Sequence, residues 1–133
     1  MIVARWIFFV AGIIGILEVV PLLMLEDRLF QGVPLAYRVH PEIFYGFVGV
    51  TFAWQIAFVL IGLEPVRLRP VMIAAMVEKF SFVIAVLWLY FAARANGLVL
   101  AFGLVDLVFG ILFVVSWLIT PDIEAEMQGF EEQ

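Results

Sequence analysis

Four acidic residues stand within or at the edge of long apolar runs: Glu18, Glu42, Glu78 and Asp106. One basic residue, Lys79, directly follows the third of them. A charge at the centre of a bilayer costs about 2.5–3.5 kcal/mol on insertion scales, so each of these residues needs a structural or functional reason. Carboxyl groups at such depth can bind a cation, carry a proton or anchor a helix through an ion pair. We therefore treat these residues as the candidate site.

The composition indicates that lipid is the solvent for most of the chain. Of its 133 residues, 66% are hydrophobic, and the mean hydropathy is +1.18. The chain has no cysteine, which excludes disulfides, thiolate catalysis and cysteine-ligated metal centres. We expect no catalytic residue, no metal site and no cofactor. The net charge of −5 comes mostly from the acidic end of the chain, and it argues against a nucleic-acid partner.

Four apolar runs separated by polar breaks predict an all-α membrane protein. The runs cover about residues 4–25, 42–63, 71–93 and 98–119. Each has the roughly 20 residues that cross about 30 Å of hydrocarbon, and backbone groups in lipid must be satisfied within a helix. We predict a four-helix transmembrane domain over residues 1–120, arranged as two antiparallel hairpins, and an acidic C-terminal tail over residues 121–133.

The segment Glu64–Pro70, Glu-Pro-Val-Arg-Leu-Arg-Pro, is a compact basic break near the middle of the chain. Its short length predicts that the second and third helices are antiparallel neighbours. Basic residues near span ends favour the cytoplasmic side of a membrane. We therefore expect a multi-pass protein of a bacterial inner membrane with this turn and both termini in the cytoplasm. The arginines on the turn side are Arg5, Arg67 and Arg69; those on the other side are Arg28, Arg38 and Arg94.

Helical periodicity places each of the four acids on a face that also carries small residues. Small residues let helices approach closely, and polar residues prefer the bundle interior, so we expect all four acids to point inward. The rise per residue brings the ammonium of Lys79 within reach of Asp106 or Glu18. The predicted faces are Ala11-Gly15-Glu18, Glu42-Gly46-Gly49-Ala53, Ala74-Glu78-Ser81-Ala85 and Gly103-Asp106-Gly110.

Polar residues of the second span have two further interpretations. Pro41 and Glu42 are typical of a helix start, because proline has no N–H to satisfy and an acid favours the positive end of the helix dipole. His40, Glu42 and Tyr45 are therefore candidates for a helix-start or interfacial role. Gln55 lies away from the small-residue face of this helix, and it indicates either a second helix contact or a subunit interface such as a homodimer.

The middle third of the chain resembles small bacterial four-helix membrane proteins without an assigned role. The motifs that carry this resemblance are His40-Pro41-Glu42, Tyr45-Gly46-Phe47, Trp54-Gln55, Pro65-x-Arg67-x-Arg69-Pro70 and Glu78-Lys79. The resemblance implies the four-helix fold and no particular activity. The segment Ile16–Val20 is also similar to the first helix of small multidrug-resistance transporters. The third span, however, has no counterpart to their Gly-x-Ala-Tyr-Ala-x-Trp stretch.

We expect a small integral membrane protein that is not an enzyme. Its predicted role is to bind a lipophilic small molecule or a membrane partner, with the buried acids fixing the helices. A structural ion pair between Lys79 and an acid is favoured over a proton relay. Two alternatives stay open: a proton- or cation-coupled carrier using Glu18, Glu78 and Asp106, and a lipid- or sterol-processing enzyme with an acidic pocket.

Overall fold

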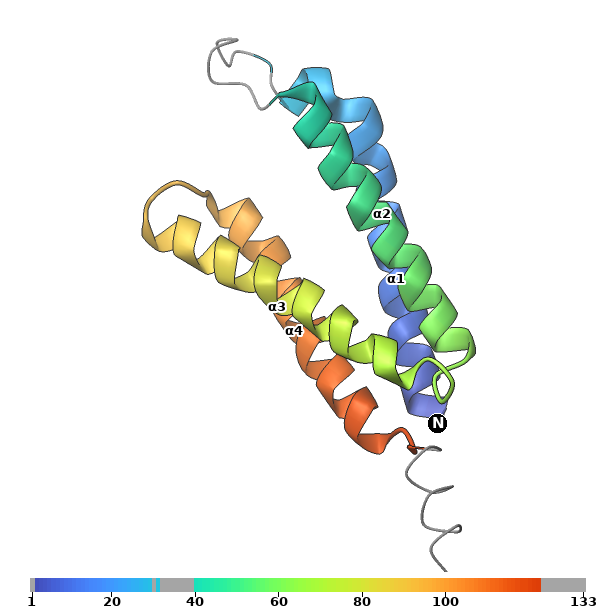
Figure 1. Ribbon diagram of the computed structural model, residues 1–133. Helices are drawn as coiled ribbons and strands as arrows, with labels where there is room; N and C mark the ends of the chain where they lie inside the picture. Colours follow the sequence, from blue (N-terminus) through green and yellow to red (C-terminus); the bar gives the residue numbers. More distant parts are fainter. Residues whose placement is uncertain (1, 30, 32–39, 123–133) are drawn as a thin grey trace, which may run out of the picture.

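The structure is a computed structural model that describes residues 2–29, 31 and 40–122. These residues form four helices: α1 (Ile2–Leu29), α2 (Pro41–Leu63), α3 (Arg69–Phe91) and α4 (Gly97–Ile119) (Figure 1). All four are long and apolar enough to cross a membrane, and the described ranges contain no strand. The predicted all-α class and the four spans are therefore confirmed. Most of the connector between the first two helices and nearly all of the acidic tail lie outside the described residues.

The turn between α3 and α4 shows how local chemistry sets the helix ends. Ala93 has φ = 55°, and the N–H of Arg94 donates to the carbonyl oxygen of Leu89 at 2.8 Å. A left-handed residue followed by a hydrogen bond that spans five residues is typical of a Schellman motif. Such a motif ends a helix by satisfying its last carbonyl groups. The side chain of Asn96 then accepts a hydrogen bond from the N–H of Val99 at 3.0 Å, as an N-cap does. The break between the third and fourth predicted spans, residues 94–97, thus contains the C-terminal cap of α3 and the N-cap of α4.

The helices associate in pairs, α1 with α2 and α3 with α4 (Figure 1). Within each pair the two helices run in opposite directions, and the two pairs diverge with distance from the turn after α2. The helices α2 and α3 touch over a short length only, near that turn. The prediction that the short turn makes α2 and α3 antiparallel neighbours therefore holds only near the turn. A tight turn fixes where two helices start, whereas their contact farther along depends on which faces pack.

Glycines on both sides bring α1 and α2 together. A Cβ atom on Gly62 would lie 2.8 Å from the backbone nitrogen of Phe9 and 2.9 Å from the carbonyl oxygen of Arg5. On α1, a Cβ atom on Gly12 would lie 2.7 Å from the carbonyl oxygen of Gln55. In lipid there is no hydrophobic force between helices, so such close backbone approach supplies the van der Waals contact that holds them.

The predicted small-residue face of α2 is not the one that packs. A Cβ atom added to Gly46 or Gly49 would meet nothing within 4 Å in the described part of the chain, and Glu42 on the same face is exposed. The buried residues of this helix include Gln55 and Phe58 instead. Gln55 therefore marks a second helix contact within the chain, which is the simpler of its two predicted roles. The expectation that all four acids point inward is wrong for Glu42.

The predicted contact face is correct for α4 but not for α3. On α4, Gly103 packs against Val86 and Gly110 against the Phe80 ring, so the face that also carries Asp106 is the contact face, as predicted. On α3 the small residues that share the predicted face with Glu78 are exposed. The buried face of α3 is offset from it and consists of Met72, Ala75, Lys79, Val83 and Val86.

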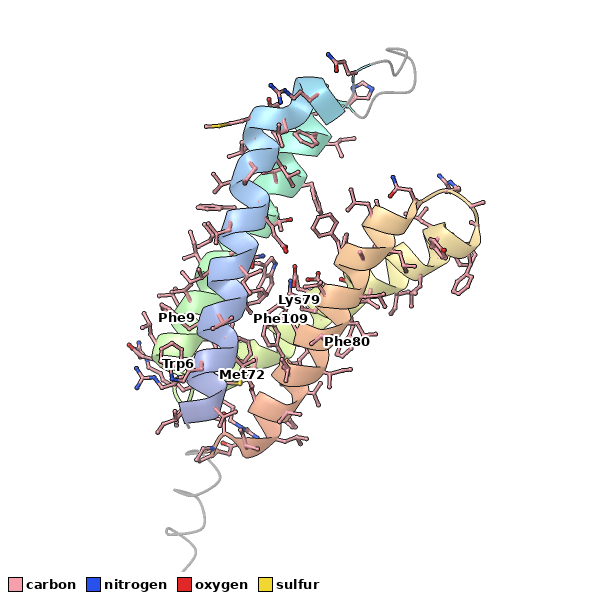
Figure 2. The ribbon with its side chains drawn as sticks, turned by 180° about the vertical axis from the view of Figure 1, so that it is seen from behind. Trp6, Phe9, Met72, Lys79, Phe80 and Phe109 are labelled. Atoms are coloured by element: carbon pink, nitrogen blue, oxygen red, sulfur yellow. The ribbon has the colours of Figure 1, made fainter. Side chains whose placement is uncertain are left out.

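A cluster of phenylalanines joins the two helix pairs. Phe8 of α1 stacks on Phe113 of α4 with ring centroids 4.0 Å apart, and Phe58 of α2 meets the same ring edge-on at 5.0 Å. Met72 and Ala75 of α3 are fully buried against this cluster (Figure 2). All four helices contribute, and every member lies toward the side of the central turn. We call this cluster the junction.

A second contact at the same side ties α3 to the end of α4. The guanidinium of Arg69 lies 4.6 Å above the Trp117 ring and donates to the Asp122 carboxylate at 2.6 Å. Arginine suits this position because its planar group can stack on an aromatic ring and bind a carboxylate at once. The contact joins the first residue of α3 to the segment after α4, so the central turn and the end of α4 lie on one side of the bundle.

The outer surface of the helices is apolar, as lipid requires. Large side chains are more than 60% exposed on all four helices, among them Leu17, Val50, Ile84 and Leu98. Trp6 and Trp88 are also exposed and lie near helix ends, where aromatic belts form at the interfaces. An apolar surface of this extent is stable only in a bilayer or a detergent micelle.

The close contact at Gly62 leads to a test of the α1–α2 packing. We expect Gly62→Ala to lower the free energy of unfolding by about 1–3 kcal/mol, because the new methyl group meets backbone atoms that cannot rotate away. Gly49→Ala on the same helix serves as the control. It should be neutral or stabilising by up to about 1 kcal/mol, since alanine favours the helix and nothing lies near. Unfolding in mixed detergent micelles measures both, and equal effects would contradict the observed packing.

Candidate functional site

A cavity of about 480 Å³ lies between the two helix pairs. All four helices contribute to it, and the residues that line it come from the middle of α1 and α3 and from the halves of α2 and α4 away from the junction. Its walls are mainly apolar, with aromatic side chains from both pairs. The aromatic residues are Phe47, Trp54, Phe82, Phe102 and Phe109.

The polar part of the cavity wall brings together the acids that the sequence singled out. Glu18, Glu78, Lys79 and Asp106 all line the cavity, and Figure 2 shows Lys79 in the space between the two pairs. They come from α1, α3 and α4, so the group forms only when all three helices pack together. Sequence separation hides this proximity, because residues 18 and 106 belong to different helix pairs.

Lys79 forms an ion pair with Asp106 across the α3–α4 contact. Its Nζ atom donates to Asp106 Oδ1 at 2.9 Å, and both side chains are largely buried. The depth estimate from the sequence left Asp106 and Glu18 open as partners of Lys79, and the structure pairs Lys79 with Asp106. The Nζ atom also lies 5.2 Å from the centroid of the Phe58 ring, where a cation–π interaction is favourable.

Glu78 supplies a second carboxylate to the same ammonium group. Its Oε2 atom lies 3.5 Å from Lys79 Nζ, but it makes no hydrogen bond in the described part of the chain. Asp106 and Lys79 both lie within electrostatic range of Glu78. The ammonium of Lys79 thus donates to Asp106 and lies close to the Glu78 carboxylate and to the face of the Phe58 ring.

Glu18 faces this group from the other helix pair. It lies within electrostatic range of both Asp106 and Lys79. Within the described ranges, however, no hydrogen bond or ion pair is formed by its carboxylate. Its side chain is also the most exposed of the four that line the cavity. Glu18 is therefore the carboxylate that a molecule in the cavity can reach.

Gln55 is a site residue whose role the sequence did not reveal. It is 2% exposed, lines the cavity and donates from Nε2 to the carbonyl oxygen of Thr51 at 3.1 Å. Its Oε1 atom is buried without a hydrogen-bond partner in the described chain, and it packs against Gly15. A buried polar atom without a partner costs about 1–3 kcal/mol, so the position calls for a donor. The only sequence signal was an amide in the middle of an apolar helix.

The helix-start candidates lie away from the cavity. His40 and Glu42 are exposed at the beginning of α2, with His40 Nδ1 3.1 Å from Glu42 Oε1, and Tyr45 is 44% exposed one turn farther on. Pro41 is the first residue of the helix, so the predicted helix start is confirmed. None of the three lines the cavity.

Comparison with known protein families, curated proteins and solved structures found no match to this chain. The resemblance to small bacterial four-helix proteins therefore stays a prediction. Among the described residues, no group of three or more His, Asp or Glu side chains is arranged to hold a metal ion.

The ion pair leads to a second prediction. We expect Lys79→Met to lower the free energy of unfolding by about 3–5 kcal/mol, because it leaves Asp106 buried without its cation. The double variant Lys79→Met/Asp106→Asn should recover most of this loss, and Glu78 accounts for the rest. Arg67→Met, which removes an exposed pair with Glu64, should change the stability little. A double-mutant cycle measured by unfolding in micelles tests the pair, and additive losses would refute it.

Proposed function

We propose that this protein binds a lipophilic small molecule in the cavity between its two helix pairs. The observation that carries the proposal is the cavity itself, about 480 Å³ with mainly apolar walls from all four helices. Small-molecule sites in proteins are typically concave, largely apolar and roughly 300–1,000 Å³ in volume, with a few polar groups that orient the ligand. The cavity agrees with each part of that description.

The junction favours binding over transport. Its buried rings Phe8, Phe58 and Phe113 fill the space between the pairs on the side of the central turn. A carrier needs access to its site from both sides in turn, whereas a binding protein needs access from one. An enzyme acting on a lipophilic substrate would need the same cavity and, in addition, groups that perform chemistry. Binding alone requires the fewest further assumptions.

A saturable photolabelling experiment tests the binding proposal. We expect a twelve-carbon alcohol with a diazirine group to label wall residues of the protein in nanodiscs. Excess unlabelled alcohol should suppress this labelling, because a cavity saturates and bulk lipid does not. Peptide mass spectrometry should locate the label on segments that line the cavity, such as those containing Trp54 or Phe102. Labelling that excess alcohol leaves unchanged would refute the proposal.

Two substitutions on α4 provide a matched control. Val105 lines the cavity, whereas Val108, less than one turn away, is 57% exposed on the outer surface. Val105→Trp should fill the cavity and reduce the saturable labelling at least about fivefold, since an overfilled site cannot accept the probe. Val108→Trp adds the same group toward lipid and should leave the labelling unchanged.

We also propose that the protein lies in a bacterial inner membrane with the central turn and both termini in the cytoplasm. Arg5, Arg67 and Arg69 all belong to the turn side, and two of them stand two residues apart where the central turn leads into α3. Each side of the membrane has three arginines near span ends, so the proposal rests on the closer spacing of Arg67 and Arg69, because basic residues near span ends favour the cytoplasmic side. The contact of Arg69 with Asp122 supports the common location of the turn and the end of α4.

Single cysteines test the orientation, because the chain has none of its own. We expect Arg94→Cys to react with a membrane-impermeant maleimide on intact spheroplasts. Arg67→Cys, which replaces an 80% exposed side chain in the central turn, should react only after the membrane is permeabilised. The reverse pattern of labelling would show that the orientation is inverted, without affecting the binding proposal.

A further inference from the structure

We infer that the ligand of this cavity is an amphiphile with a protonated amine, whose N–H groups are bound by Glu18 and its neighbours. This assignment rests on the proposed binding function and specifies the chemical class of the ligand. It follows from which polar atoms of the cavity wall have partners and which do not.

Apart from the indole N–H of Trp54, the polar side-chain atoms of the cavity wall that have no hydrogen-bond partner in the described chain are acceptors. Gln55 Oε1 is buried without a hydrogen-bond partner in the described chain, and Glu78 Oε2 has only its 3.5 Å ion pair with Lys79. The Glu18 carboxylate has neither a hydrogen bond nor an ion pair there. A flip of the Gln55 amide would exchange its nitrogen and oxygen, but it would also break the hydrogen bond from Nε2 to the carbonyl oxygen of Thr51. A molecule that satisfies this wall must therefore supply donors.

The charges of the wall favour a cation among the possible donors. Three carboxyl groups line the cavity with a single ammonium group, that of Lys79. This ammonium is already committed to Asp106 at 2.9 Å and lies 3.5 Å from Glu78. The charge of Glu18 is therefore not compensated by a residue of its own. A hydrogen bond from a charged donor is shorter and roughly twice as strong as one between neutral groups, which favours an ammonium over a hydroxyl.

The remaining walls suit the apolar part of such a molecule. Aromatic side chains surround the polar group from both helix pairs, among them Trp54 of α2 and Phe102 and Phe109 of α4. A cation also binds favourably over the face of an aromatic ring, Trp best of all. The cavity thus combines an acidic, acceptor-rich end with an apolar, aromatic remainder. An alkyl- or arylalkylamine has the complementary distribution.

Competition against the diazirine alcohol tests the inference. Four unlabelled competitors of equal chain length are compared in zwitterionic nanodiscs at neutral pH: dodecylamine, dodecyltrimethylammonium, dodecanol and dodecanoate. We expect dodecylamine to compete at a mole fraction about tenfold lower than dodecanol. The trimethylammonium compound should be weaker than the amine, because it has charge but no N–H group, and dodecanoate should be the weakest.

Glu18→Gln provides the decisive variant. It should reduce the advantage of the amine over the alcohol to less than about threefold while saturable labelling by the neutral probe persists, which shows that the protein remains folded. Glu64→Gln makes the same change on an exposed acid of the central turn and should keep the full advantage.

The possible failures are distinguishable. Equal competition by amine and alcohol in the wild-type protein, or an unchanged advantage in Glu18→Gln, would overturn the inference and leave the binding function intact. Absence of saturable labelling by the neutral probe would overturn the binding function itself.

Discussion

The aromatic junction is the contact on which the rest of the structure depends. In lipid, helices gain nothing from hiding apolar surface, so they associate only where shape complementarity gives more contact than lipid does. Phe8, Phe58 and Phe113 provide that contact between the two pairs on one side of the bundle. Away from the junction, the pairs diverge and leave the cavity between them. The junction thus determines both that the four helices form one unit and where that unit is hollow.

The positions of the four helices could be predicted from the sequence, because the residues at each helix end determine where it begins or stops. Run length, Pro41 and the 94–97 turn locate the ends to within a few residues. It was insufficient for the packed faces of α2 and α3. In a soluble helix the apolar side identifies the interior, but here lipid and interior are both apolar, so that signal is lost. The glycines gave the right face on α4, whereas on α2 Gly46 and Gly49 point to open space and Gly62 makes the contact.

The candidate site was predictable to a similar degree, and for a related reason. The sequence narrowed the partner of Lys79 to Asp106 or Glu18, because all three residues are costly in lipid and lie at matching depth. Which of the two forms the ion pair could not be derived, since the distance of Glu18 from Lys79 depends on the angle that the junction sets. The cavity and the unpartnered oxygen of Gln55 depend on the same angle. The sequence identifies the charged residues within the spans. Their neighbours in space depend on how the two helix pairs pack.

The Glu18 carboxylate is the group that the proposed binding mode and the carrier alternative have in common. An excess of carboxylates over cations in a medium of low dielectric constant is costly unless a cation or a proton compensates it. In this cavity the single charge of Lys79 is shared by the acids of α3 and α4, and Glu18 has no ion pair in the described chain, so it is the carboxylate left to be neutralised from outside. An amine and a proton would both serve, and they cannot occupy the same carboxylate together. Binding of a cationic amphiphile at Glu18 therefore implies competition with protons at that residue. This competition is the thermodynamic requirement for coupling ligand movement to a proton, whether or not the bundle ever opens on its other side.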